Sequence, residues 1–285
     1  MSQGVTKLIH KYLRHDKKFP HVWCPGCGNG IVLGALIRAI DRIGLEKDEI
    51  VLASGIDCSG RMPVYVDFNT LHTTHGRALT FATGIKLAKP SLTVIAIMGD
   101  GDATAIGGNH FIHAARRNLN LTAIIINNQI YGMTGGQSSP TTPYGSYATT
   151  APYGLIEHAF SIAELAVTAG APFVARGTVY HVETLEDLVK KAILKRGFAV
   201  VEVISNCHVQ YGRRNNMGDP VTMMKWMRDH AIRVEKASSM SIDDMEGKFT
   251  IGVLADVEKP IYTEEYQKIR EGAIKGRPTG GPGHG

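Results

Sequence analysis

Short aliphatic runs alternate with segments of helical apolar spacing along this chain, and this alternation constrains the fold more than any other feature. The predicted strands are Ile50–Ser54, Thr93–Met98, Leu121–Asn127, Phe173–Val179 and Phe198–Ile204. The predicted helices between them are Ile31–Ile43, Gly76–Lys89, Gly108–Asn118, Ser161–Ala169 and Leu185–Lys195. Strands that are apolar along their whole length and alternate with helices indicate an α/β fold: a mostly parallel sheet with helices on both faces.

Composition and charge exclude two classes of protein. The formal net charge is +5, and the Lys and Arg residues are scattered rather than gathered in a stripe, which disfavours nucleic-acid binding. The apolar runs are far shorter than the roughly 20 residues that cross a bilayer, which excludes a membrane-spanning helical protein as the second class. The first residues, Met1-Ser2-Gln3, lead into a charged segment without an apolar signal region, so we expect a cytoplasmic protein.

The pattern of elements predicts one domain followed by an extension. The strand and helix alternation covers residues 1–210, and residues 211–285 form a C-terminal extension that ends in the Gly/Pro-rich tail Gly276–Gly285. One long polar loop, Thr134–Tyr153, interrupts the domain. Because long loops inside compact domains are usually functional or covered by a partner, we expect this loop to have such a role.

A Gly-Asp-Gly turn follows the second predicted strand, in the segment Gly99-Asp100-Gly101-Asp102. The carboxyl end of a parallel strand is where α/β sheets bind ligands. Glycines let the backbone approach a phosphate, and Asp100 offers the hard oxygen that Mg²⁺ prefers. An aspartate between glycines is also a common tight turn, so this segment alone does not establish a phosphate site.

A second element strengthens the phosphate and metal interpretation. The next strand ends in Asn127-Asn128, followed by Gln129-Ile130-Tyr131-Gly132, and 25 residues, 102 to 126, separate Gly101 from Asn127. Two neighbouring strand ends would then converge on one ion. The segment His75-Gly76-Arg77 precedes a predicted helix and offers an imidazole and a guanidinium beside its start.

The four cysteines are candidate ligands of a metal centre. Cys24 and Cys27 lie in a Gly-rich turn, and the other two thiols are Cys58 and Cys207. Four thiolates match a [4Fe–4S] cluster or a zinc site, whereas the local Cys-Pro-Gly-Cys segment also matches a thioredoxin-like redox pair. The local sequence leaves the three interpretations open.

The wider context favours the cluster. Cys58 and Cys207 each follow a predicted strand, so they share the edge of the sheet that carries the Gly-Asp-Gly turn. A cluster there would lie within electron-transfer reach of the phosphate site, where zinc would have no redox role.

Taken together, these segments resemble the β subunits of 2-oxoacid:ferredoxin oxidoreductases, which have the diphosphate-binding domain of the thiamine diphosphate fold. The short chain and the loop from Met133 to Pro143 look most like the two-subunit 2-oxoglutarate enzymes, also called 2-oxoglutarate synthases. The resemblance covers Trp23 to Cys207, and its motifs are Cys24-Pro25-Gly26-Cys27-Gly28, Gly55-Ile56-Asp57-Cys58, His75-Gly76-Arg77-Ala78, Gly99-Asp100-Gly101-Asp102, Asn127-Asn128 and Tyr131-Gly132-Met133-Thr134-Gly135-Gly136-Gln137.

The resemblance implies three cofactors and a set of residues for each: thiamine diphosphate, Mg²⁺ and a [4Fe–4S] cluster. Asp100, Asn128 and the Ile130 carbonyl would bind Mg²⁺, and His75 and Asn128 would be catalytic. The cluster ligands would be Cys24, Cys27, Cys58 and Cys207. The expected cofactor contacts are Gly28, Asp57, Cys58, His75, Gly76, Arg77, Gly99, Asp100, Gly101, Asp102, Asn128, Ile130, Gly132, Met133 and Thr134.

The resemblance also implies a reaction and partners. A 2-oxo acid, expected to be 2-oxoglutarate, would be decarboxylated with coenzyme A to acyl-CoA, with ferredoxin taking the electrons, and the reverse carboxylation would use the same site. The glutamate that activates the thiamine ring would come from an obligate α subunit in an α₂β₂ assembly. The alternatives are a family member that acts on pyruvate or a branched-chain 2-oxo acid, a cluster-free thiamine decarboxylase or carboligase subunit, and a zinc-stabilised binding scaffold.

Overall fold

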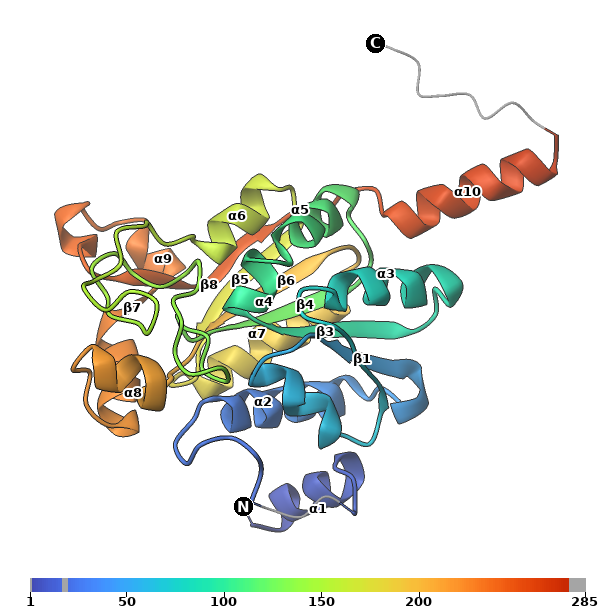
Figure 1. Cartoon of the computed structure of the whole chain (residues 1–285). Helices are drawn as coiled ribbons and strands as arrows, with labels where there is room; N and C mark the ends of the chain where they lie inside the picture. Colours follow the sequence, from blue (N-terminus) through green and yellow to red (C-terminus); the bar gives the residue numbers. More distant parts are fainter. Residues whose placement is uncertain (1, 17–19, 277–285) are drawn as a thin grey trace.

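The computed structural model describes residues 2–16 and 20–276, and within them one eight-stranded sheet forms the centre of the molecule (Figure 1). Its strand order is β2-β1-β3-β4-β6-β5-β8-β7. All neighbouring strands are parallel except β5 and β8. The strands are β1 (Ile50–Ser54), β2 (Asn69–His72), β3 (Thr93–Gly99), β4 (Thr122–Asn127), β5 (Phe173–Thr178), β6 (Ala199–Ile204), β7 (Ala231–Arg233) and β8 (Phe249–Asp256).

Helices cover both faces of the sheet, and short helical turns follow several strands (Figure 1). The α-helices are α1 (Ser2–Tyr12), α2 (Asn29–Ile43), α3 (Ala78–Ala88), α4 (Asp100–Thr104), α5 (Gly108–Arg117), α6 (Ile162–Thr168), α7 (Val182–Leu194), α8 (Pro220–His230), α9 (Val234–Ala237) and α10 (Tyr262–Ile274). The shorter helical turns are η1 (Lys47–Glu49), η2 (Ser59–Val64), η3 (His208–Gly212) and η4 (Asp243–Met245). No helix in the described part of the chain is long and apolar enough to cross a membrane.

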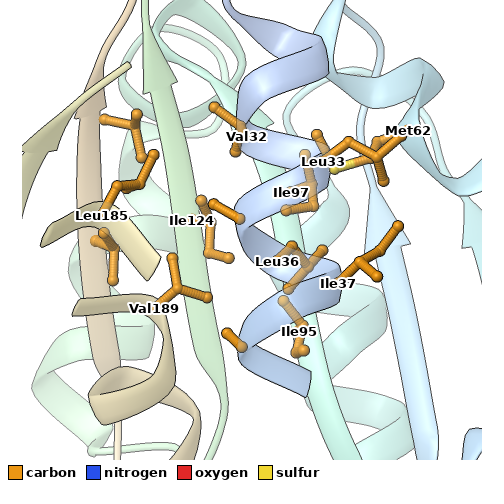
Figure 2. Packing of buried hydrophobic residues seen from close by; sticks show 14 of the residues in the cluster. Val32, Leu33, Leu36, Ile37, Met62, Ile95, Ile97, Ile124, Leu185 and Val189 are labelled. Atoms are coloured by element: carbon orange, nitrogen blue, oxygen red, sulfur yellow. The ribbon is translucent and has the colours of Figure 1, made fainter. Parts of the chain in front are cut away.

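Alternate residues of the central strands pack on opposite faces because successive side chains of a strand point in opposite directions. Ile95, Ile97 and Ile124 face α2 and α7, where they meet Leu36 and Val189 (Figure 2). The intervening residues of the same strands face α3, α5 and α6. The central strands are therefore buried on both sides, which explains why they are apolar along their whole length.

The ten predicted elements are all present, with ends that differ by a few residues, and the predicted α/β class is confirmed. The segment from residue 211 onward does more than extend the domain, because β8 pairs antiparallel with β5 and β7 pairs with β8 in the same sheet. The predicted tail lies, from residue 277 onward, outside the described residues.

Truncating the core residue Leu36 to alanine is expected to lower the free energy of unfolding by about 2–5 kcal/mol, since its side chain is completely buried between α2 and the sheet. Urea unfolding of the purified protein measures this. Leu194→Ala is the matched control: that leucine is 57% exposed, and its loss should change the free energy by no more than about 0.5 kcal/mol. Equal effects of the two substitutions would contradict the described core.

Candidate cofactor site and cysteine cavity

The carboxyl ends of β1, β3, β4 and β6 lie side by side at one edge of the sheet. The parallel register aligns Ser54 with Ile97, Gly99 with Ile126, and Asn127 with Ile204. Residues that directly follow these strands therefore gather at one place, although they are far apart in the sequence. Two adjoining cavities open there.

The first cavity lies around the Gly-Asp-Gly turn. Most of its lining comes from the loops after β1, β3 and β4, so its walls are strand ends and their turns. The lining residues are Ile56, Asp57, Cys58, Ser59, His75, Gly99, Asp100, Gly101, Asp102, Ile126, Asn128, Ile130, Tyr131, Gly132, Met133 and Thr134.

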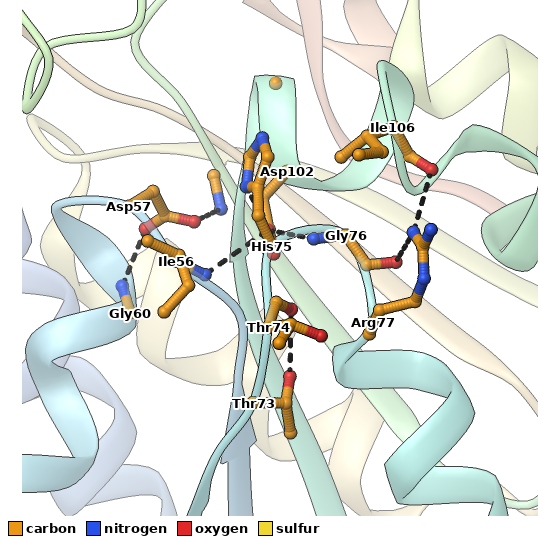
Figure 3. Close-up of polar contacts among 12 residues, drawn as sticks. Ile56, Asp57, Gly60, Thr73, Thr74, His75, Gly76, Arg77, Asp102 and Ile106 are labelled. Atoms are coloured by element: carbon orange, nitrogen blue, oxygen red, sulfur yellow. Dashed lines mark hydrogen bonds and ion pairs between the residues drawn. The ribbon is translucent and has the colours of Figure 1, made fainter.

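Asp57 ties the loop after β1 to the Gly-Asp-Gly turn. Its Oδ1 accepts a hydrogen bond of 2.6 Å from the Gly60 N–H (Figure 3) and another from the Ser59 hydroxyl. Its Oδ2 accepts a hydrogen bond of 2.7 Å from the Gly99 N–H. An ideal Cβ on Gly99 would lie 3.0 Å from the Asp57 carboxylate. The glycine thus permits a backbone approach that a larger residue would disturb.

Asp102 orders the segment that carries His75. Its buried Oδ1 accepts a hydrogen bond of 2.6 Å from the Gly76 N–H and lies 2.7 Å from the Nδ1 atom of His75, a close contact without good hydrogen-bond alignment (Figure 3). Burial, followed by the charge of Asp57, raises the pKa of Asp102. The contact at Nδ1 leaves Nε2 as the ring nitrogen of His75 that is available to the cavity.

Asp100 lies deeper in the same site. Its Oδ2 accepts hydrogen bonds from the Ser139 hydroxyl at 2.5 Å and from the Thr141 hydroxyl at 2.6 Å. Burial raises its pKa to about 6, against the lowering effect of these two donors. Both hydroxyls come from the polar loop Thr134–Tyr153, so the loop orients a predicted metal ligand.

The turn after β4 separates the two asparagines. Asn127 faces away from the cavity and donates through Nδ2 to Glu202 at 2.8 Å, whereas Asn128 lines the cavity. Gln129 has a positive φ of 63°, an uncommon conformation for a residue that is not glycine. After this turn, Asn128 and the buried Ile130 line the same cavity as Asp100.

Replacing Gly55 by alanine is expected to weaken cofactor binding because the new methyl group would overlap the Asp102 carboxylate. We expect a loss of about 1–3 kcal/mol in the free energy of unfolding and at least about tenfold weaker thiamine diphosphate binding. Gly84→Ala is the matched control, since a Cβ added at that position of α3 would meet no atom within 4 Å; it should raise the free energy of unfolding by about 0.5–1 kcal/mol. Cofactor titration and urea unfolding check both variants, and unchanged binding in Gly55→Ala would contradict the packing.

All four cysteines line the second cavity. Its walls come from the turn before α2, the loop after β1, the turn after β4 and the start of η3. The lining residues are Val22, Trp23, Cys24, Cys27, Cys58, Arg61, Asn128, Gly132, Met133, Asn206, Cys207, His208, Val209 and Gln210.

Three of these thiols, Cys27, Cys58 and Cys207, are partly buried, whereas Cys24 is exposed. Burial raises the pKa of Cys27 to about 11 and that of Cys58 to about 12, and it also raises the pKa of Cys207. Backbone amides counteract part of this effect: the Asn29 N–H interacts with Cys27, and the N–H groups of Gln210 and Tyr211 interact with Cys207. Amides directed at cysteine sulfur are what iron–sulfur sites use to tune their potential.

The two cavities share a wall made of Cys58, Asn128, Gly132 and Met133. Gly132 is the thinnest part of it: an ideal Cβ there would lie 3.2 Å from the Cys207 Sγ and 3.7 Å from the Cys58 Sγ. A ligand in the first cavity and a group held by the thiols would therefore be direct neighbours.

Most of the predicted site residues come together here, and three do not line either cavity. Gly28 packs against Ser205 and Val179, and Gly76 donates its N–H to Asp102 from behind the site. Arg77 donates to the carbonyls of Gly76 and Ile106 (Figure 3). The assignment of these three residues as cofactor contacts therefore has no support from the cavity geometry.

Several residues at the site were not predicted. Ser139 and Thr141 hold Asp100, and Ile56 and Ser59 line the first cavity. Trp23 closes the second cavity and donates its Nε1–H to the Cys58 carbonyl at 2.6 Å. The only signal for the two hydroxyls was the polar composition of their loop.

Comparisons with known proteins agree with this site. The family model described as thiamine pyrophosphate enzyme, C-terminal TPP binding domain, matches residues 52–203, which run from within β1 to within β6 and contain all the residues that line the first cavity. The fold and the site thus define a thiamine pyrophosphate-binding domain of that enzyme class.

The individual relatives narrow the class. The chain is 50% identical to the 2-oxoglutarate synthase subunit KorB of Methanocaldococcus jannaschii over 92% of this chain and 96% of that one. It is 48% identical to the 2-oxoglutarate synthase subunit KorB of Archaeoglobus fulgidus over 93% of this chain and 95% of that one. A solved 2-oxoglutarate:ferredoxin oxidoreductase from Magnetococcus marinus, with 2-oxoglutarate, coenzyme A and succinyl-CoA bound, superposes with a TM-score of 0.83 at 34% identity, covering 96% of this chain and 92% of that chain. The chain belongs to the KorB subunit family of 2-oxoglutarate synthases.

Proposed function

We propose that this chain is the β subunit of a 2-oxoglutarate:ferredoxin oxidoreductase that converts 2-oxoglutarate and coenzyme A to succinyl-CoA and CO₂, reduces ferredoxin, and runs the reverse carboxylation at the same site. The observation that carries the proposal is the shared wall of Cys58, Asn128, Gly132 and Met133 between the two cavities. The names of the relatives support 2-oxoglutarate as the substrate.

The first cavity suits thiamine diphosphate held through Mg²⁺. Thiamine diphosphate supplies, when bound, the carbon nucleophile and the electron sink that decarboxylation of a 2-oxo acid requires. Asp100, the Asn128 amide oxygen and the Ile130 carbonyl provide the hard oxygen donors that Mg²⁺ takes. His75, which contacts Asp102 through Nδ1, lines the same cavity and would offer Nε2 to a bound group as a hydrogen-bond partner.

The second cavity suits a [4Fe–4S] cluster on the four cysteines. Within residues 2–16 and 20–276, no three His, Cys, Asp or Glu side chains are placed to hold a single metal ion. All four thiols line this one cavity, and four thiolates are the ligand set that a [4Fe–4S] cluster takes. The amides near Cys27 and Cys207 would stabilise the thiolate ligands.

The proposed enzyme needs other subunits. The relatives are named as subunits, and thiamine enzymes of this kind take the glutamate that activates the ring from a separate pyrimidine-binding domain. We infer that an α subunit supplies this glutamate in an α₂β₂ assembly, in the cytoplasm, and that residues 211–285 contribute to the contact with it.

Anaerobic purification of the chain together with its α subunit tests the proposal. Iron, sulfide and thiamine diphosphate analysis should give about four irons and one thiamine diphosphate per β chain. Ferredoxin reduction should require both 2-oxoglutarate and coenzyme A. Thiamine diphosphate without iron would contradict the cluster assignment, and faster turnover of pyruvate than of 2-oxoglutarate would contradict the substrate.

A further inference from the structure

A buried polar chain runs behind the proposed magnesium site, from β5 across β6 and β4 to the Gly-Asp-Gly turn. Arg176 Nε lies 2.7 Å from Glu202 Oε2, and the two residues are direct partners in the β5–β6 register. Glu202 Oε1 accepts from Asn127 Nδ2 at 2.8 Å. The Thr141 hydroxyl then lies 3.0 Å from Asn127 Oδ1 and 2.6 Å from Asp100 Oδ2.

Glu202 is an unexpected residue for its position. It lies on a central parallel strand, its side chain is 2% exposed, and its neighbours Val201 and Val203 are fully buried. A buried carboxylate costs free energy even when it is paired, and an aliphatic residue would suit the strand equally well. Packing alone therefore does not explain a glutamate here.

Besides its contacts with Arg176 and with the Ala163 N–H, Glu202 has a further role that the contacts of Asn127 indicate. The Gln129 N–H donates to Asn127 Oδ1 at 3.2 Å, which identifies that atom as the oxygen and directs Nδ2 toward Glu202. A carboxylate at position 202 accepts only, so it holds the amide in this one orientation. The oriented amide in turn fixes the turn to Ile130 through the Gln129 N–H. Its Oδ1 also lies beside the Thr141 hydroxyl, whose one hydrogen is donated to Asp100 Oδ2, the nearer acceptor.

We propose that Glu202, held by Arg176 and acting through Asn127 and Thr141, is a positioning residue for the Mg²⁺ ligands Asp100, Asn128 and Ile130. The inference rests on the proposed function, because it requires that Mg²⁺ and thiamine diphosphate bind at this site. Residues that orient metal ligands in this way typically change metal affinity about 10–100-fold when they are replaced.

An exchange of donor and acceptor tests the inference. Asn127→Asp places two carboxylates against each other. Glu202→Gln directs the N–H donor of its side-chain amide at either Arg176 or Asn127, which are themselves donors. Each variant should weaken Mg²⁺ binding in the presence of thiamine diphosphate about 10–100-fold. The double variant Asn127→Asp/Glu202→Gln restores one donor and one acceptor at the contact, and its affinity should return to within about threefold of wild type. Thr141→Val lies in a loop and tests the link to Asp100 without altering the sheet; it should weaken Mg²⁺ binding about tenfold.

Titration calorimetry of the α-subunit complex with Mg²⁺ and thiamine diphosphate, together with unfolding temperatures measured without metal, gives the readout. Thr122→Val is the matched control, since it removes a buried hydroxyl bond to the Ala192 carbonyl at the other end of β4; it should lower the unfolding temperature and leave the Mg²⁺ affinity unchanged. Unchanged Mg²⁺ affinity in Asn127→Asp and Thr141→Val would overturn the inference and leave the proposed function standing. So would a double variant that binds Mg²⁺ as weakly as the single variants. A wild-type complex that binds no thiamine diphosphate overturns the proposed function and the inference with it.

Discussion

Cys58→Ser is expected to remove the absorbance near 400 nm that an iron–sulfur cluster gives and to abolish ferredoxin reduction, while thiamine diphosphate stays bound. Of the four cysteines, Cys58 is the one that lines both cavities, so a group held by its thiol would adjoin a ligand in the first cavity. A serine hydroxyl is a poor iron ligand because it stays protonated near neutral pH, and loss of one of the four proposed ligands would leave the proposed cluster open to release or oxidation. Activity should fall at least about 1,000-fold, since the electrons have no other acceptor.

Iron content, the visible spectrum and bound thiamine diphosphate are measured on the same anaerobic sample of this variant. Met62→Leu is the matched control, because it also removes a sulfur atom close to Cys58 in the sequence. Met62 lies in the turn η2, four residues after Cys58, and its side chain packs in the core outside both cavities. Four irons retained in Cys58→Ser would contradict the ligand set, and iron lost in Met62→Leu would show that the region does not tolerate change.

Asp100→Asn is expected to have the opposite pattern: thiamine diphosphate is lost and the iron stays. Asparagine has nearly the same size as aspartate but carries no charge. The hydroxyls of Ser139 and Thr141 both donate to Oδ2 of Asp100, and in one of the two orientations of the asparagine amide its nitrogen, which cannot accept, would take that place. The variant would lack the one carboxylate among the proposed Mg²⁺ ligands, so the apparent Mg²⁺ affinity should fall at least about 100-fold. Turnover should fall with cofactor occupancy and recover in part at high Mg²⁺ and thiamine diphosphate concentrations.

Equilibrium dialysis against labelled thiamine diphosphate over a range of Mg²⁺ concentrations measures this effect. Asp67→Asn serves as the charge-matched control, because Asp67 is exposed and pairs with Lys47 at 2.6 Å, away from both cavities. Undiminished cofactor binding in Asp100→Asn would remove Asp100 from the metal site. Loss of both cofactors in either variant would mean that the two cavities do not act as separate sites.

Some elements could not be read from the sequence because tertiary contacts create them. β2 consists of four residues, Asn69–His72, at the edge of the sheet, and these residues are at most half-buried. It therefore has no apolar run from which a strand could be predicted. β8 is only partly buried and contains Gly252 with a positive φ of 122°, and it is a strand because β5 offers it a partner. Local spacing carries no information about either pairing.

The sequence by itself determined the central strands, the helices between them and the convergence of Asp100, Asn128 and Cys58. A parallel strand buried on both faces has to be apolar, and all strands of a parallel sheet end at the same edge, so residues that follow such strands must meet. The tertiary structure alone decided which neighbours they meet. Thr141 and Glu202 reach the site from a loop and from a strand distant in the sequence, and Arg77 turns away to the Ile106 carbonyl. Such contacts depend on how loops and side chains pack after the sheet has formed, and the order of residues along the chain does not encode them one by one.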